Sequence, residues 1–287
     1  GGTTFNPILV GVLFRGTNTF TIYGNNGTFL DTASTTTYIA IGGASSVGSV
    51  EANKQFKVKT AGTANFLKNY VTSNARTTNS TVRFRINGAN GSGVLTITGS
   101  ATGYFEDTSN TDSVAVDDLI NISVTTGTGT GETDSTLSGV SIDTTNNNEQ
   151  LLNFSIGGTT VTTGLTRYFS IAGRADATTT ETDITADFNL GATFSKLEIY
   201  VSSNTITANS TLRLRKNQAN GNQVVTITAS TTGWFEDASN TDSIIKTDEM
   251  NYSIVTGATG TSIIVESIGA LAQIANDQFF QLLGLGT

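Results

Sequence analysis

The sequence contains neither cysteine nor histidine among its 287 residues. Without cysteine the chain has no disulfide, no thiol nucleophile and no cysteine-ligated metal site. Without histidine it lacks the commonest general base, the serine–histidine–aspartate triad and the usual zinc ligands. These two absences argue against an enzyme, and we predict no catalytic residue in this chain.

Charge and long apolar runs are also scarce. Only 13% of the residues are charged, the net charge is −8, and no run of lysine or arginine exceeds two residues. A nucleic-acid surface needs a concentrated cationic field, so nucleic acid is not an expected partner. No apolar run approaches the roughly 18 residues that span a bilayer, so we expect no membrane insertion. The chain opens Gly1-Gly2 without methionine, so we expect either a removed leader or pro-segment, or numbering that begins inside a longer product.

What the chain does have is threonine, serine, asparagine and glycine, together with 37% hydrophobic residues. Threonine favours strands, the other three favour turns, and all four are poor helix formers. Short apolar stretches in which every second residue is apolar recur at intervals of about 8–12 residues, a spacing typical of β-sandwiches and barrels. The composition therefore predicts an all-β protein.

The most informative feature is an internal repeat. Residues 70–127 return as residues 200–257 without a gap, at an offset of 130 positions (200 − 70), with more than half of the positions identical. This period is too long for a solenoid repeat and suits an independent β-sandwich. We therefore divide the chain into a lead-in arm (1–31), a first module (32–143), a polar linker (144–150), a second module (151–269) and a docking tail (270–287).

One strand within the repeat shows the expected alternation clearly. In TVRFRI, Val82, Phe84 and Ile86 face one way and Arg83 and Arg85 face the other. The next strand follows after NGANG, or NQANG in the second copy. The Asn-Gly pair inside this segment, Asn90-Gly91 in the first copy, adopts positive φ at little cost, which predicts a hairpin turn there.

The outward-facing arginines of this strand have two interpretations. They are expected to form cross-strand ion pairs on a solvated face, for example with Glu106 and Glu236. Alternatively, they hold an anion or the carboxylates of a partner.

An acidic loop also occurs twice. FEDTSNTDSVAVDD (105–118) returns as FEDASNTDSIIKTD (235–248). Hard oxygen ligands of this kind can bind Ca²⁺, although the spacing is not that of an EF-hand. The alternative is a turn whose Asp and Asn side chains cap backbone groups. The candidate calcium ligands are Glu106, Asp107, Asp112, Asp118, Glu236, Asp237, Asp242 and Asp248.

Two equivalent aromatic residues, Tyr104 and Trp234, precede phenylalanines in the repeat. Neighbours in a strand point to opposite faces, so one aromatic of each pair is expected in the core and the other at the surface or at an interface. An exposed Tyr or Trp can stack on a sugar ring, which makes these two residues glycan-binding candidates.

The two ends of the chain are apolar. Residues 8–14 (ILVGVLF) read either as a first strand buried in its own module or as an arm that completes the sheet of a neighbouring subunit. The tail has no counterpart in the first module and reads as a short helical turn or an extended docking segment, which we expect to be buried. The candidate interface residues are Ile8, Val10, Val12, Phe14, Phe279, Phe280 and Leu282.

The segments FRINGANGSGVLTIT and LRKNQANGNQVVTIT, with the acidic turn that comes after each, are similar to jelly-roll modules that recur in tailed-phage virion proteins and in trimeric surface proteins of the C1q/TNF-like kind. The resemblance covers both modules. It implies two tandem antiparallel jelly-roll β-sandwiches with a structural or adhesive role and no enzymatic activity.

These observations lead to a graded functional prediction. The first choice is a structural subunit on the outside of a particle or cell, a phage capsid decoration or fibre protein. The alternatives are an extracellular filament subunit assembled by N-terminal strand exchange, and a carbohydrate-binding adhesin or receptor-binding protein. The expected partners are further copies of the chain, capsid lattice proteins or surface glycans. The expected location is extracellular or on a virion surface, and no cofactor is expected, with structural calcium as the alternative.

Overall fold

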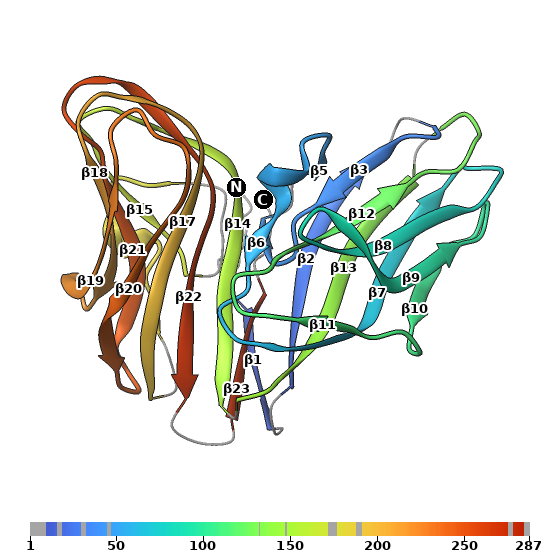
Figure 1. The fold of residues 1–287 in the computed structure, drawn as a ribbon, viewed down its shortest axis with the longest axis horizontal. Helices are drawn as coiled ribbons and strands as arrows, with labels where there is room; N and C mark the ends of the chain where they lie inside the picture. The colour runs from blue at the N-terminus through green and yellow to red at the C-terminus, as the bar shows by residue number, and fades with distance from the viewer. Residues whose placement is uncertain are drawn as a thin grey trace, which may run out of the picture.

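The computed structural model of the chain describes residues 10–15, 19–29, 33–44, 47–131, 133–146, 148–171, 177–187, 191–274 and 278–283. The protein is all-β, and it forms two β-sandwiches that stand side by side (Figure 1). The first sandwich is built from the blue-to-green part of the chain and the second from the yellow-to-red part. In the described residues no helix is long and apolar enough to cross a membrane.

Each sandwich uses eight main strands. The first contains β2 (Thr19–Phe29), β3 (Thr36–Ile39), β7 (Gly62–Asn74), β8 (Ser80–Ile86), β9 (Ala89–Ile97), β10 (Gly103–Asp107), β12 (Leu119–Thr125) and β13 (Thr133–Thr144). The second contains β14 (Glu149–Thr162), β15 (Thr166–Phe169), β17 (Ala192–Ile206), β18 (Ser210–Lys216), β19 (Ala219–Ile227), β20 (Gly233–Ile244), β21 (Glu249–Val255) and β22 (Gly260–Ile274). The remaining elements are β1 (Val10–Arg15), β4 (Gly43–Ala44), β5 (Val47–Gly48), β6 (Phe56–Lys57), β11 (Asp112–Val114), β16 (Ala186–Asp187), β23 (Gln278–Leu283) and the 3₁₀ turns Glu51–Lys54 and Glu181–Asp183.

The order of the strands is that of a jelly roll in both sandwiches. Counting the eight main strands along the chain, one sheet has the order six-three-eight-one (β10-β7-β13-β2) and the other two-seven-four-five (β3-β12-β8-β9). The second sandwich has the same two orders, β20-β17-β22-β14 and β15-β21-β18-β19. This is the two-sheet arrangement of jelly rolls, so the predicted fold class is confirmed. We call the two units the first and second jelly roll.

Each jelly roll has its own apolar core, formed by the alternation that the sequence displays. β8 and β18 have the same burial pattern, with Val82 and Phe84 buried in the first and Leu212 and Leu214 in the second. Burying one such side chain contributes about 1.5–3 kcal/mol. Equivalent buried strand residues therefore stabilise the two jelly rolls in the same way.

The two jelly rolls share one sheet. The short strand β4 pairs in parallel with β2 on one side and with β14 on the other, so it joins the two four-stranded sheets. With β4 itself and with β11, which pairs with β7, they form a ten-stranded sheet. The division of the chain therefore differs from the predicted boundaries. β2 lies within the predicted lead-in (1–31), β13 and β14 extend into the predicted linker (144–150), and β22 continues to Ile274 in the predicted tail.

The hairpin between β8 and β9 is present, but its turn lies three residues earlier than predicted. Asn87 and Gly88 have φ values of 51° and 77°, whereas Asn90 and Gly91 already belong to β9. A two-residue turn of this kind needs positive φ at both central residues, because only then does it match the twist of the flanking strands. The second copy forms the same turn with Asn217 and Gln218.

The two ends of the chain pair with each other. β1 and β23 form an antiparallel two-stranded ribbon, with Val10 opposite Leu283 and Arg15 opposite Gln278. The tail is therefore extended here rather than helical, and the N-terminal strand pairs with the tail of its own chain. Ile8 lies outside the described residues and the other six interface candidates lie in this ribbon; their role in contacts between subunits stays a prediction.

Candidate functional site

The outer side of β17 and β20 carries two glutamates directly opposite each other. Leu197, Ile199 and Val201 point into the core of the second jelly roll, so Glu198 between them points outward. In the register of the two strands, Glu198 lies opposite Glu236. Like charges in this position repel each other unless a cation lies nearby.

Lys59 of the first jelly roll provides this cation. Its Nζ lies 2.9 Å from Glu198 Oε2, 2.7 Å from Glu236 Oε2 and 3.0 Å from Asp117 Oδ1. The Lys59 side chain is 1% exposed and that of Glu198 is 0% exposed. The segment that carries Lys59 is also anchored to the second jelly roll, because Lys196 Nζ donates a hydrogen bond to the Lys59 carbonyl oxygen at 3.0 Å.

Asn153 contacts Glu198 across the strand that lies between them. Asn153 on β14 and Glu198 on β17 both lie opposite Gly269 of the intervening strand β22. Because Gly269 has no side chain, Asn153 reaches across it, and its Nδ2 donates to Glu198 Oε1 at 2.8 Å. A Cβ on residue 269 would lie 2.6 Å from Asn153 Cγ, so this contact requires glycine. Asn153 Oδ1 is buried and has no hydrogen-bond partner among the described residues.

The electrostatics of this cluster follow from its burial. Burial raises the pKa of Glu198 from its ordinary 4.5 to about 8, although the nearby Lys59 acts in the opposite direction. Burial also works to lower the pKa of Lys59, but contact with Glu198, Glu236 and Asp117 outweighs it and raises that pKa overall. One lysine among three carboxylates keeps its proton, and the most buried carboxylate, Glu198, is the one that binds a proton near neutral pH.

Trp234 lies at the same contact between the two jelly rolls. Its ring stacks on Tyr200 with centroids 5.1 Å apart, Lys57 Nζ lies 5.3 Å from its centroid, and its side chain packs against the core of the first jelly roll. Leu151 of β14 is itself a member of that core. Trp234 therefore serves as an interface aromatic in this structure.

The equivalent side of the first jelly roll is open. There, Lys68 and Glu106 form a cross-strand ion pair of 2.8 Å, and Tyr104 stacks on Tyr70 with centroids 4.4 Å apart. Tyr104 is 75% exposed and Phe66 is 42% exposed. We call these five residues (Phe66, Lys68, Tyr70, Tyr104 and Glu106) the first face, and their equivalents (Lys196, Glu198, Tyr200, Trp234 and Glu236) the second face.

The aspartates of the acidic loop cap backbone amides. Asp107 accepts hydrogen bonds from the Val94 amide at 2.8 Å and from Asn110 Nδ2 at 2.9 Å. Asp112 accepts from the amides of Ser92 and Gly93 at 2.6 and 2.8 Å. The copies Asp237 and Asp242 have the equivalent partners, and Asp118 and Asp248 cap the amides of residues 115 and 245.

These hydrogen bonds determine the protonation of Asp107 and Asp237. Burial works to raise their pKa, but the donated hydrogen bonds outweigh it and lower it overall. The carboxylates are thus distributed among separate caps. Within the described ranges, no group of three or more acidic residues is arranged to hold a metal ion. The remaining two calcium candidates, Glu106 and Glu236, belong to the first and second faces.

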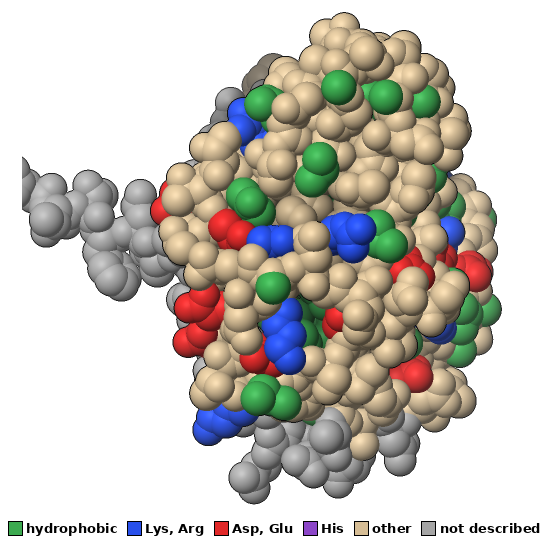
Figure 2. Space-filling view, turned by 90° about the vertical axis from the view of Figure 1, so that its left-hand side faces the viewer, with side chains coloured by type: hydrophobic (Ala, Val, Ile, Leu, Met, Phe, Trp, Pro, Cys, Tyr) green, Lys and Arg blue, Asp and Glu red, His purple; other side chains and the backbone are tan. Residues whose placement is uncertain are grey.

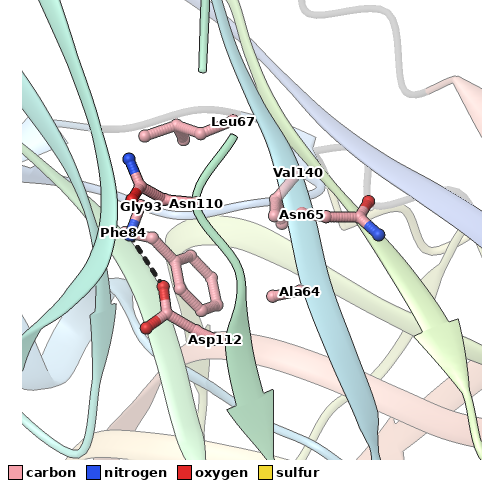
Figure 3. Close-up of a pocket in the computed structure, with 8 residues that line it drawn as sticks. All are labelled: Ala64, Asn65, Leu67, Phe84, Gly93, Asn110, Asp112 and Val140. Carbon is pink, nitrogen blue, oxygen red and sulfur yellow. Dashed lines mark hydrogen bonds between the residues drawn. The ribbon is translucent and has the colours of Figure 1, made fainter. Parts of the chain in front are cut away.

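One small pocket adjoins the acidic loop. Figure 3 shows Asp112 and Phe84 beneath it and Leu67, Asn65 and Val140 around it. Its volume of about 10 Å³ is about the space of one water molecule. This pocket is therefore too small for a sugar ring.

Two of the outward-facing arginines, Arg85 and Arg215, have other partners than predicted. Arg85 pairs with Glu51 of the first 3₁₀ turn at 2.8 Å, and Arg215 pairs with Glu181 of the second at 2.8 Å. Glu106 and Glu236 bind lysines instead. The 3₁₀ turns carry no strand signal, so the strand alternation alone did not indicate them as sources of a carboxylate.

Sequence reasoning missed the cluster of Lys59, Asn153 and Glu198. These residues are far apart in the chain and only the fold brings them together. A signal was nevertheless present in the aligned repeats, because Lys68 of the first copy is replaced by Glu198 in the second, opposite an unchanged glutamate.

Comparison with known proteins finds no matching family model and no matching curated protein. Among solved structures, the chain is similar to the infectious bursal disease virus VP2 subviral particle, with 9% identity, 99% of this chain and 79% of that chain covered, and a TM-score of 0.28. The structure of the Gx strain of the same virus gives 10% identity, coverage of 98% and 78%, and a TM-score of 0.28. These structural neighbours are viral capsid proteins. The similarity is low, so a function for this chain has to be argued from its own strand order and contacts.

Proposed function

We propose that the chain is a non-enzymatic structural subunit on the outside of a particle or cell, with a virion decoration or fibre protein as the first choice. The observation that carries this proposal is the difference between the two faces. The second face is covered by the neighbouring jelly roll, whereas the equivalent first face exposes Tyr104 and Phe66.

The first face has the composition of a contact surface. Protein interfaces are enriched in aromatic residues, and here Tyr70 and Tyr104 form a stacked pair beside the ion pair of Lys68 and Glu106. By contrast, the side of the second jelly roll shown in Figure 2 is largely polar, and its hydrophobic side chains are scattered singly. Scattered apolar residues are ordinary on a protein surface. The first face is therefore the better candidate for a contact with a further copy or with a lattice protein.

The proposal is tested by changing the first face and a control site in the same way. Tyr104→Glu places a charge in the centre of the first face, and Ile245→Glu does so at a residue of the second jelly roll that is 61% exposed. We expect the wild-type chain and Ile245→Glu to form an oligomer by light scattering and electron microscopy, and Tyr104→Glu to remain a monomer. A wild-type chain that stays monomeric at high concentration, or an oligomer that Tyr104→Glu leaves intact, contradicts self-association through this face.

A filament subunit is the second candidate because of the ribbon of β1 and β23. Among the described residues, each strand of this two-stranded ribbon has only one pairing partner. The N-terminal strand of one subunit has the length and direction to pair with the tail of another. Deleting residues 1–15 then yields a chain that no longer polymerises, whereas Tyr104→Glu leaves filaments intact.

An adhesin is favoured only by the exposed tyrosine stack. Tyr104 presents its ring to solvent, as a sugar-binding aromatic does, whereas Trp234 has both Tyr200 and Lys57 against it. Glycan-array binding that is lost in Tyr104→Ala with an unchanged circular dichroism spectrum supports this role over assembly. Glycan binding that survives in this variant would show that the tyrosine stack is not the glycan-binding site.

A further inference from the structure

Two buried side chains, one from each jelly roll, meet the buried carboxylate of Glu198. Lys59 Nζ lies 2.9 Å from one oxygen of the Glu198 carboxylate, and Asn153 Nδ2 donates to the other oxygen at 2.8 Å. Lys59, Asn153 and Glu198 are only 1%, 2% and 0% exposed. An amine, a carboxamide and a carboxyl group are thus held together in a place that excludes water.

We propose that Lys59 and Asn153 join through an intramolecular isopeptide bond whose formation Glu198 promotes. The bond forms between Lys59 Nζ and Asn153 Cγ, and it links the first jelly roll covalently to the second. This inference goes beyond the proposed structural role and does not depend on whether the chain self-associates.

The reaction needs no oxidant and no added reagent. The Lys59 ammonium gives one proton to the Glu198 carboxylate, and the neutral amine attacks Cγ of Asn153. The tetrahedral intermediate passes a proton from Nζ to Nδ2 through Glu198, the bond between Cγ and Nδ2 breaks, and ammonia leaves. Ammonia takes up the remaining proton, so one ammonium and one carboxamide become one secondary amide and one ammonium ion.

Glu198 is suited to carry these protons. Its burial raises its pKa to about 8, so the protonated and ionised forms both occur near neutral pH. Protonated Glu198 can donate to Asn153 Oδ1, which is otherwise a buried oxygen without a partner among the described residues. This hydrogen bond stabilises the negative charge that develops on the oxygen during the attack.

The fold supplies the positioning. Gly269 leaves open the space through which Asn153 approaches Glu198, and the three strands β14, β22 and β17 fix both residues at one level of the sheet. Holding two reactants together in this way replaces a bimolecular encounter by a local step. The surrounding carboxylates keep Lys59 protonated at rest, which makes the step slow, but each chain needs to complete it only once.

Among the described residues, the first jelly roll has no such set at the equivalent positions. The positions equivalent to Asn153 and Glu198 hold Tyr23 and Lys68, although Gly139 is retained between them. We therefore expect a single cross-link per chain. Glu236 and Asp117 also contact Lys59, and amide formation with either of them would release water instead of ammonia.

Mass spectrometry decides between these outcomes. We expect the intact wild-type chain to be lighter than its sequence by one ammonia molecule, and digestion to give one branched peptide that contains Lys59 and Asn153. A chain of full sequence mass, or one that has lost water, overturns the proposal. Because this measurement needs only the purified wild-type chain, it is decisive even if a variant fails to fold.

Matched variants test the roles of the residues. Lys59→Arg keeps the positive charge but cannot form the amide, and Glu198→Gln keeps the shape but cannot carry the proton. Both are expected to have full sequence mass and an unchanged circular dichroism spectrum, while the control Lys246→Arg, at an exposed lysine, still loses ammonia. A cross-link that forms at the wild-type rate in Glu198→Gln contradicts the role of Glu198.

Discussion

The first and second faces occupy equivalent positions in two copies of one fold, yet one is open and the other is covered. In the first face, Lys68 lies opposite Glu106 on the neighbouring strand, and the two charges compensate each other. In the second face, Glu198 at the lysine's position leaves two glutamates facing each other across the strand pair. The lysine-to-glutamate difference therefore leaves the second face with two opposed acidic residues that need a cation from outside. Lys59 of the other jelly roll provides that cation.

This difference explains how two similar sandwiches adopt one arrangement. Packing of apolar residues such as Trp234 and Leu151 favours contact but tolerates sliding, because it has little directionality. A buried lysine that must meet Glu198 and Glu236 allows one position only. Buried ion pairs are weak evidence for added stability, and fixing a register is their best-attested use.

The largest expected effect is the loss of the cation from one face only. Lys59→Met removes the amine from among Glu198, Glu236 and Asp117 and also prevents the proposed cross-link, and we expect it to lower the free energy of unfolding by at least about 3–5 kcal/mol. The equivalent change in the first face, Lys68→Met, breaks an exposed pair and is expected to cost at most about 1 kcal/mol. Urea unfolding of both variants measures the difference. Equal costs would show that the two faces are energetically alike and that Lys59 does not specify the contact.

The second expected effect is a pH dependence that only the second face carries. In the folded chain, Glu198 keeps its proton up to about pH 8. In the unfolded chain, the same carboxyl group loses its proton near its ordinary pKa of 4.5. The folded state binds more protons over this window, so the stability contributed by Glu198 is complete below about pH 4.5 and is lost as the pH rises toward 8. The free energy of unfolding falls by at most about 1.4 kcal/mol per pH unit over this range.

Glu198→Gln isolates this effect, because the chain has no histidine and no other side chain ordinarily titrates between about pH 5 and 8. We expect urea unfolding of the wild type to become easier as the pH rises through this window and that of Glu198→Gln to change little. The variant Glu106→Gln in the first face serves as the control and should follow the wild type. A flat wild-type profile contradicts the raised pKa of Glu198.

A third effect should be the same in both jelly rolls. Asp107 and Asp237 accept matching sets of hydrogen bonds from the neighbouring loop and strand. Replacing either by alanine leaves these amides without acceptors, at an expected cost of about 1–3 kcal/mol. The two variants should agree within the error of urea unfolding, since their partners are equivalent. A large difference between them would mean that the loops, and not only the faces, have diverged.

The sequence was sufficient to predict what is local. Alternation in strands such as β8 and the turn residues between them indicated β-sandwiches, because each signal lies within a few residues of the chain, and the resemblance of the repeated segments to jelly-roll modules indicated the type. It was not sufficient for β2, whose sequence TFTIYGNNGTF contains glycines and asparagines that weaken a strand signal.

The site shows the same limit. The capping role of the acidic loop was among the interpretations of the sequence, because local caps such as that of Asp107 on the Asn110 amide follow from short spacings. The caps of Asp107 and Asp112 on the preceding strand β9 depend on the fold. The contact of Lys59 with Glu198 depends on how the two sandwiches meet, which no local pattern records. Only the charge reversal between the repeats, Lys68 against Glu198, indicates from the sequence that the two faces differ.

The smallest expected effect concerns the hairpin turns, where the copies differ by one residue. Gly88 and Gln218 occupy the same turn position with φ of 77° and 61°. A side chain in this left-handed region is strained by about 1 kcal/mol relative to glycine. The hydrogen bonds that Arg85 and Arg215 donate to this position go to backbone oxygens, so they survive a substitution there.

Gln218→Gly should therefore stabilise the second jelly roll by somewhat less than about 1 kcal/mol, because glycine also gains freedom in the unfolded chain. Gly88→Gln should destabilise the first by a similar amount. Urea unfolding of the two variants, which exchange the turns of the two copies, should give shifts of opposite sign. Shifts of the same sign would mean that contacts of the glutamine side chain outweigh the backbone strain.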